Sequence, residues 1–140
     1  MSLRLEKNCG AWTLDFRPDF TAAESGLDAF INWNKDFVGK EASLIEKKQG
    51  VKKKLVTMII DTKDIDVTND EAILKDNKCV GYITSGGYAH HVKKSMALGY
   101  VPEKLSTHDT ILDVEINGKL YSAHVTDRPL YDANGEKMRT

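Results

Sequence analysis

Five lysines within eight positions form the densest group of chemically active side chains: Lys47, Lys48, Lys52, Lys53 and Lys54. Such a group can hold a phosphate or a polyanionic ligand, and with interleaved aromatic residues it can bind nucleic acid. No aromatic residue interrupts this run. The 20 basic and 21 acidic residues leave a net charge of −1, so the chain has no general attraction to polyanions. We therefore expect a solvated helix end and loop and no nucleic-acid partner. A nucleic-acid-binding barrel, whose affinity would fall steeply with salt, is a minor alternative.

The four histidines and their neighbours do not form a recognisable catalytic or metal-binding motif. They are His90, His91, His108 and His124. If His90 and His91 lie in a strand, their side chains point to opposite faces, and no ligand spacing typical of a metal site is present. Ser85 lies close to His90 in sequence, but no nucleophile-elbow pattern accompanies it. We expect no metal and assign no catalytic residue from the residues alone.

Length and cysteine usage favour an ordinary cytoplasmic protein. The 140 residues can bury a core without disulfides. Cys9 and Cys79 stand far apart and suggest neither a disulfide framework nor a zinc site, so two reduced thiols in the cytoplasm are expected. No apolar run approaches the roughly 20 residues of a membrane helix, so no membrane partner is expected.

The first 50 residues predict a helical lead-in. Thr21 and Glu24 have the spacing of a capping box, in which each side chain satisfies a free backbone N–H. Residues 40–49 combine good helix formers with apolar positions, and Gly50 is a natural terminator. Residues 30–33 could form a short strand. The lead-in has too few apolar residues for its own core, so we expect it to pack on the rest of the chain or on a partner.

After residue 50 the pattern changes from helical to β. Short apolar runs separated by turn residues predict six strands near residues 55–60, 72–74, 79–83, 95–101, 111–116 and 120–125. Asn117-Gly118 is a strong hairpin signal. The segment 84–95 is polar and predicts a long loop in which Gly86-Gly87 makes a turn and a ligand could be met. The spacing of the six predicted strands is typical of a small antiparallel barrel or sandwich, and closure into a barrel would remove exposed strand edges. We predict an α+β chain: a helical lead-in over 1–50 and a small antiparallel six-stranded β barrel over 51–140.

Four segments in series resemble the C-terminal part of the glycine-cleavage T-protein family of aminomethyltransferases. The segments are SLRLEK at 2–7, then Ala11-Trp12 with RPDFTAAESGLDAFINWNKDFVGKEA at 17–42, VGYITSGGYAHHVKKSMALGYVP at 80–102, and RPLYDANGEKMR at 128–139. They cover nearly the whole chain. The stretches KSMALGYVP and PLYDANGEKMR are most similar to the folate-binding half of dimethylglycine and sarcosine dehydrogenases.

The resemblance implies the end of a folate-binding region followed by a C-terminal barrel. It implies a function in which tetrahydrofolate accepts a one-carbon unit from a small amine donor. The family's catalytic Asp precedes the L-R-L-E motif, and nothing here corresponds to that region. The chain is therefore expected to be a C-terminal fragment, inactive alone, that needs an N-terminal portion or partner subunit. The alternative is a non-catalytic barrel module that binds or regulates a partner protein.

The resemblance also implies which residues bind the cofactor. The Arg and Glu of L-R-L-E line the family's folate pocket, and here they are Arg4 and Glu6. A guanidinium suits a carboxylate, and a carboxylate accepts hydrogen bonds from pterin N–H groups. Tyr88 and Arg139 are further candidates. The sequence departs from the family at Ala89-His90, where Ser-Pro is frequent, at Leu130, where Phe is usual, and at Ala133, where Pro is usual.

Overall fold

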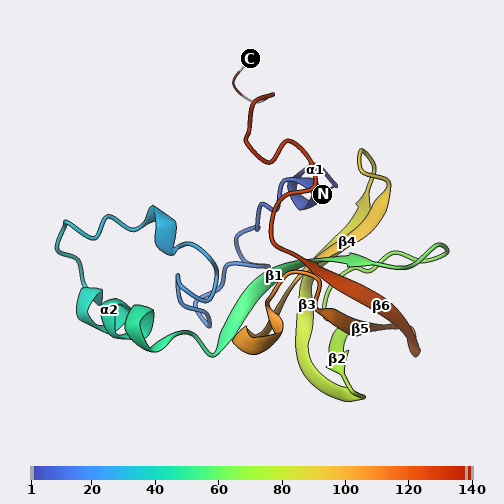
Figure 1. The fold of residues 1–140 in the computed structure, drawn as a ribbon, viewed down its shortest axis with the longest axis horizontal. Coiled ribbons are helices and arrows are strands. Elements are labelled where there is room, and N and C mark those ends of the chain that lie inside the picture. Colours follow the sequence, from blue (N-terminus) through green and yellow to red (C-terminus); the bar gives the residue numbers. More distant parts are fainter. Residues whose placement is uncertain (1, 138, 140) are drawn as a thin grey trace.

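Six antiparallel strands close into a barrel in the computed structural model, which describes residues 2–137 and 139. The strands are β1 (Lys53–Ile60), β2 (Ala72–Lys75), β3 (Lys78–Ala89), β4 (Lys94–Pro102), β5 (Ile111–Ile116) and β6 (Lys119–Thr126). Their order around the barrel is β1-β4-β3-β2-β5-β6, so that β1 pairs with both β4 and β6. Figure 1 shows the strands gathered on one side of the molecule. The predicted six-stranded barrel is confirmed.

The barrel interior is the principal core. Along β5 buried and outward positions alternate, with Leu112, Val114 and Ile116 turned inward. Inward side chains of the other strands, such as Met58 and Val125, join the same cluster. Burying each large aliphatic side chain stabilises the fold by about 1.5–3 kcal/mol. The alternating pattern therefore specifies which face of each strand points inward.

The lead-in contains three short helical elements, and only the first packs on the barrel. Helix α1 (Ser2–Glu6) lies against β3 and β4, where Leu5 is fully buried. The 3₁₀ helix η1 (Asp28–Phe30) and helix α2 (Lys40–Gln49) follow, and neither contains a buried residue. Figure 1 shows α2 standing apart from the strands. A further 3₁₀ helix, η2 (Glu103–Leu105), follows β4.

Local signals in the lead-in are mostly confirmed. Thr21 N–H donates to Glu24 Oε2 at 3.1 Å, and Glu24 N–H donates to Thr21 Oγ1 at 3.2 Å, which is the capping box. Helix α2 ends at Gln49 and is followed by the predicted terminator Gly50, whose φ is +83°. The predicted strand at 30–33 is wrong, because residues 28–30 form η1 and no neighbouring strand pairs with the segment.

The predicted loop at 84–95 is also wrong. β3 continues to Ala89, and its hairpin with β4 pairs Tyr88 with Ser95, which leaves only residues 90–93 as a turn. Gly86 is not in a turn: a Cβ there would lie 2.7 Å from a Val67 methyl carbon. The absence of a side chain at Gly86 lets the segment that contains Val67 approach the backbone of β3 closely. The two adjacent histidines lie in the turn and not in a strand.

No helix among the described residues is long and apolar enough to cross a membrane.

Candidate functional site

Helix α1 closes over the β3–β4 hairpin and brings the L-R-L-E segment to it. Leu5 packs with Ala89, Met96 and Leu98 in a second apolar cluster outside the barrel interior. Polar contacts join the helix to the hairpin turn: His90 N–H donates to Ser2 Oγ at 2.9 Å. The apolar side chain of α1 thus fixes the helix, and its polar side chains meet exposed backbone N–H groups of the turn.

Glu6 is the most unusual side chain of this junction. It is fully buried, and its Oε1 accepts a hydrogen bond from His91 N–H at 2.7 Å and from Ser2 Oγ at 3.2 Å. Its Oε2 has no hydrogen-bond partner among the described residues. A buried carboxylate oxygen without a donor is unfavourable by about 1–3 kcal/mol or more. The junction therefore contains a carboxylate with unused accepting capacity.

Arg4 is engaged inside the protein. Its Nη1 lies 3.0 Å from Asp15 Oδ2 and donates to Cys9 O at 3.3 Å, and its side chain is 18% exposed. Asp15 is fully buried. It also accepts from Ala11 N–H at 2.7 Å and from the hydroxyls of Thr84 and Ser85. This network joins the lead-in to β3.

A buried tyrosine extends the network. Tyr100 donates its hydroxyl to the backbone carbonyl of Asp15 at 2.9 Å, and its Oη lies 2.8 Å from Ser25 Oγ. Its ring stacks on Phe20 with 3.6 Å between centroids. Burial raises the pKa of Tyr100, the negative charge of Asp15 adds to this rise, and the hydrogen bond with Ser25 opposes it. The hydroxyl therefore remains protonated and serves as a structural donor.

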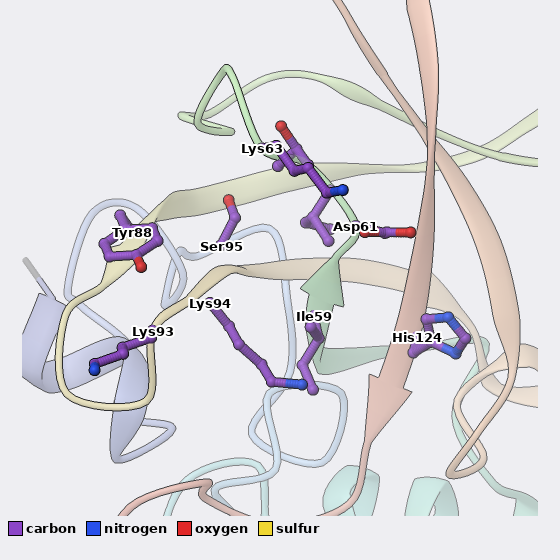
Figure 2. A pocket seen from close by; sticks show the side chains of 10 residues that line it. Ile59, Asp61, Lys63, Tyr88, Lys93, Lys94, Ser95 and His124 are labelled. Atoms are coloured by element: carbon purple, nitrogen blue, oxygen red, sulfur yellow. The ribbon is translucent and has the colours of Figure 1, made fainter.

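Tyr88 and Arg139 lie apart from this network. Tyr88, on β3, is 39% exposed, and its ring meets the His90 ring edge-on with 5.1 Å between centroids. It borders a cavity of about 530 Å³ (Figure 2). Arg139 is exposed, and its backbone N–H donates to Glu136 O at 3.1 Å. No contact in the described part of the chain joins its side chain to Arg4, Glu6 or Tyr88.

The C-terminal segment crosses α1 and holds it from the other side. Tyr131 N–H donates to Glu6 O at 3.2 Å, and Lys7 Nζ lies 3.3 Å from Asp132 Oδ2. Desolvation acts to raise the pKa of Asp132, but hydrogen bonds from Lys137 N–H and the Lys7 ammonium together hold it below its usual value. The residues that surround Glu6 thus come from both ends of the sequence and from the hairpin.

Sequence reasoning missed most of these supporting residues. Asp15 lies outside the segments that carry the family resemblance, and the sequence does not pair it with Thr84 and Ser85, because these contacts join positions about 70 apart in the chain. Burial of the Asp15 carboxylate among four donors is visible only in three dimensions. In residues 2–137 and 139, no three His, Cys, Asp or Glu side chains are grouped to hold a metal ion.

Comparison with known proteins identifies the barrel. Residues 53–132 match the family model described as the glycine cleavage T-protein C-terminal barrel domain. The human mitochondrial dimethylglycine dehydrogenase is 40% identical over 131 residues, which are 92% of this chain and 15% of that protein. An aminomethyltransferase of Desulfitobacterium hafniense is 33% identical over 135 residues, covering 96% of this chain and 37% of that protein.

A solved structure has the same fold. The crystal structure of glycine cleavage system aminomethyltransferase T from Bartonella henselae superposes with a TM-score of 0.85 at 25% identity. The match covers 94% of this chain and 38% of that one. The chain therefore spans well under half the length of the relatives it matches. Because the family model matches most of the chain, the chain belongs to the glycine cleavage T-protein C-terminal barrel domain family.

Proposed function

We propose that this chain forms the C-terminal part of a tetrahydrofolate-dependent aminomethyltransferase or demethylating enzyme. The enzyme would transfer a one-carbon unit from a small amine donor to folate. Residues 1–50 would end its folate-binding region, and residues 51–140 would form its barrel domain. Relatives with the names aminomethyltransferase and dimethylglycine dehydrogenase support this proposal, and this chain spans 37% and 15% of their lengths. Under this proposal catalysis would require residues beyond this chain, and the chain alone is expected to be inactive.

The buried carboxylate of Glu6 is the observation that carries the proposal. A pterin ring presents N–H donors, and Glu6 Oε2 has no donor among the described residues. Bound tetrahydrofolate supplies the amine nitrogen that accepts the one-carbon unit. The role of this chain would be to bind and orient the cofactor through Glu6. It would also limit water around the carboxylate, because Glu6, the last residue of α1, is fully buried against the hairpin turn and the C-terminal segment.

The other three residues would have lesser roles. Arg4 would be a positioning residue, because its Nη1 is held by Asp15 and fixes the helix that carries Glu6. The half-exposed ring of Tyr88 is able to stack on an aromatic part of the cofactor. The exposed guanidinium of Arg139 is able to pair with a carboxylate of folate.

Calorimetric titration with tetrahydrofolate tests the proposal. We expect weak or absent binding to this chain, and clear binding to a chimera in which the chain replaces the matching part of the Desulfitobacterium aminomethyltransferase. In the chimera Glu6→Gln should weaken binding about tenfold. The amide of Gln replaces one acceptor oxygen of the carboxylate with an N–H donor, which cannot bind the N–H donors of the cofactor. Glu41→Gln, a change on exposed α2, should have no effect.

Thermal unfolding without the cofactor controls for a loss of structure in Glu6→Gln. A folded chimera that ignores tetrahydrofolate, while the parent aminomethyltransferase binds it, would overturn the proposal. Equal binding by Glu6→Gln would leave the family assignment intact but remove Glu6 from the pocket.

A second function is favoured by the exposed apolar side chains of the lead-in. Trp12 is 77% exposed, Phe30 85% and Val38 fully exposed. Such side chains are typical of a surface that docks on another protein, so a non-catalytic barrel module that binds a partner is the alternative. Sedimentation of the chain with candidate partners distinguishes this module from the enzyme fragment. A strictly monomeric chain that binds no partner would count against the partner-binding module.

A further inference from the structure

The cavity that Tyr88 borders is not lined by Glu6 and lies where β1 ends beside the β3–β4 hairpin. The cavity has a volume of about 530 Å³. Its lining comes from the end of β1 and the residues after it, from the hairpin, and from His124 on β6 (Figure 2). Because these segments are distant in sequence, no sequence motif marks the cavity.

The lining is rich in positive charge. Lys63, Lys93 and Lys94 all border the cavity, and Asp61 is its single carboxylate. In the part of the chain that the structure describes, none of these lysines has an ion-pair partner within 4.0 Å. Figure 2 shows Lys94 extending toward Ile59 and Lys63 on the opposite side of the space. Three lysines therefore border one hollow with a single carboxylate, and none of the three is held in an ion pair within the described residues.

Ser95, another residue that borders the cavity, has an unsatisfied hydroxyl. Ser95 is 3% exposed, and its Oγ has no hydrogen-bond partner among the described residues. In the sheet Ser95 sits between Ile60 of β1 and Tyr88 of β3. A buried hydroxyl without a partner costs about 1–3 kcal/mol, and an acceptor placed in the cavity would relieve that cost after a rotation of the Ser95 side chain.

We infer that this cavity binds a small multivalent anion that carries phosphate or carboxylate groups. Lysine ammonium groups form charge-assisted hydrogen bonds with such anions. The hydroxyl of Tyr88 and the His124 ring add polar contacts at the rim. The volume of the hollow suits a compact ligand, and one half-exposed tyrosine provides no series of stacking surfaces for a nucleic-acid strand. The inference does not rest on the proposed folate function.

Titration of the whole chain with pyrophosphate and with citrate tests the inference and distinguishes phosphate from carboxylate ligands. The backbone amide resonances of residues 61–63 and 93–95 should shift on binding, and sodium chloride at equal ionic strength should not reproduce the shift. Each of Lys63→Ala and Lys94→Ala should weaken binding roughly tenfold. The matched changes Lys48→Ala and Lys52→Ala, in the lysine run of the lead-in, should leave affinity unchanged.

The Ser95→Ala variant distinguishes binding in the cavity from nonspecific binding to positive charge. It should weaken anion binding several-fold and should not destabilise the fold, because the lost hydroxyl has no partner. Absence of binding to both probes at 10 mM (on the order of the weakest useful affinity) would overturn the inference. Equal losses in the Lys48 and Lys63 variants would also overturn it, since binding would then reflect overall charge.

Discussion

Asp15 shows how one side chain can fix the position of a whole segment. Its carboxylate is fully buried, and it is contacted by Arg4, Ala11, Thr84 and Ser85. A charge in a dry environment is tolerated only when several donors surround it. These contacts tie the irregular residues after α1 to β3, and through Arg4 they hold the helix on which Glu6 lies.

Removing this carboxylate should be costly. We expect Asp15→Ala to lower the free energy of unfolding by about 3–5 kcal/mol, because it leaves a largely buried guanidinium and several buried donors unpaired. Asp19→Ala is the matched control: Asp19 pairs with Arg17 at 2.7 Å, but both side chains are about half exposed. That exposed pair should contribute less than about 1 kcal/mol. Urea denaturation measures both, and equal losses would show that the buried network does not secure the lead-in.

At the scale of elements, α1 is held by tertiary contacts and not by its own stability. Its five residues are far fewer than the roughly 12–15 at which an isolated helix becomes even marginal in water. Leu5 packs the helix against the β3–β4 hairpin, and the C-terminal segment crosses its other side. The helix is therefore stabilised by its contacts with the barrel and with the C-terminal segment.

Two leucines on α1 test this dependence. Leu5 is fully buried, whereas Leu3 is 75% exposed on the same helix. Leu5→Ala should destabilise the chain by about 2–5 kcal/mol through lost burial and a cavity, and Leu3→Ala should change stability by no more than about 0.5 kcal/mol. Chemical denaturation of the two variants gives the comparison. A small loss for Leu5→Ala would mean that α1 is not docked on the hairpin.

At the scale of the whole molecule, the barrel and the later part of the lead-in differ in how much tertiary packing stabilises them. The barrel is closed, so every strand is paired on both sides. Helix α2 has no buried residue, and its exposed Lys47 places the ammonium over the ring of the partly exposed Trp33, 4.6 Å from the ring centroid. Such a helix gains little from tertiary packing, which is the main source of helix stability in proteins.

Native-state hydrogen exchange should reveal this difference. Backbone amides of α2 should open with a free energy below about 2 kcal/mol, while amides of β1 and β4 should approach the free energy of global unfolding. If α2 amides exchange as slowly as those of the central strands, the helix must be packed on something, such as a second copy of the chain. Repeating the measurement over a range of protein concentrations would identify that case.

The sequence alone was sufficient to predict the six-stranded antiparallel barrel. Alternation in residues 111–116, the Asn117-Gly118 turn and the Thr21–Glu24 capping box are local patterns, and local patterns act through backbone geometry and burial of one face. The glycines at 86–87 were misleading, because a polar, glycine-containing segment is read as a loop unless its pairing partner is known.

The tertiary structure alone decided where chemistry is possible. The burial of Glu6, the contacts of Asp15 and the placement of Lys63 and Lys94 at one cavity all depend on residues from separate segments of the chain. Desolvation and charge depend on distances across the fold, which the closed barrel and the packing of α1 set. A sequence pattern can indicate which residue types are present, but only packing determines which of them lose water and which face each other.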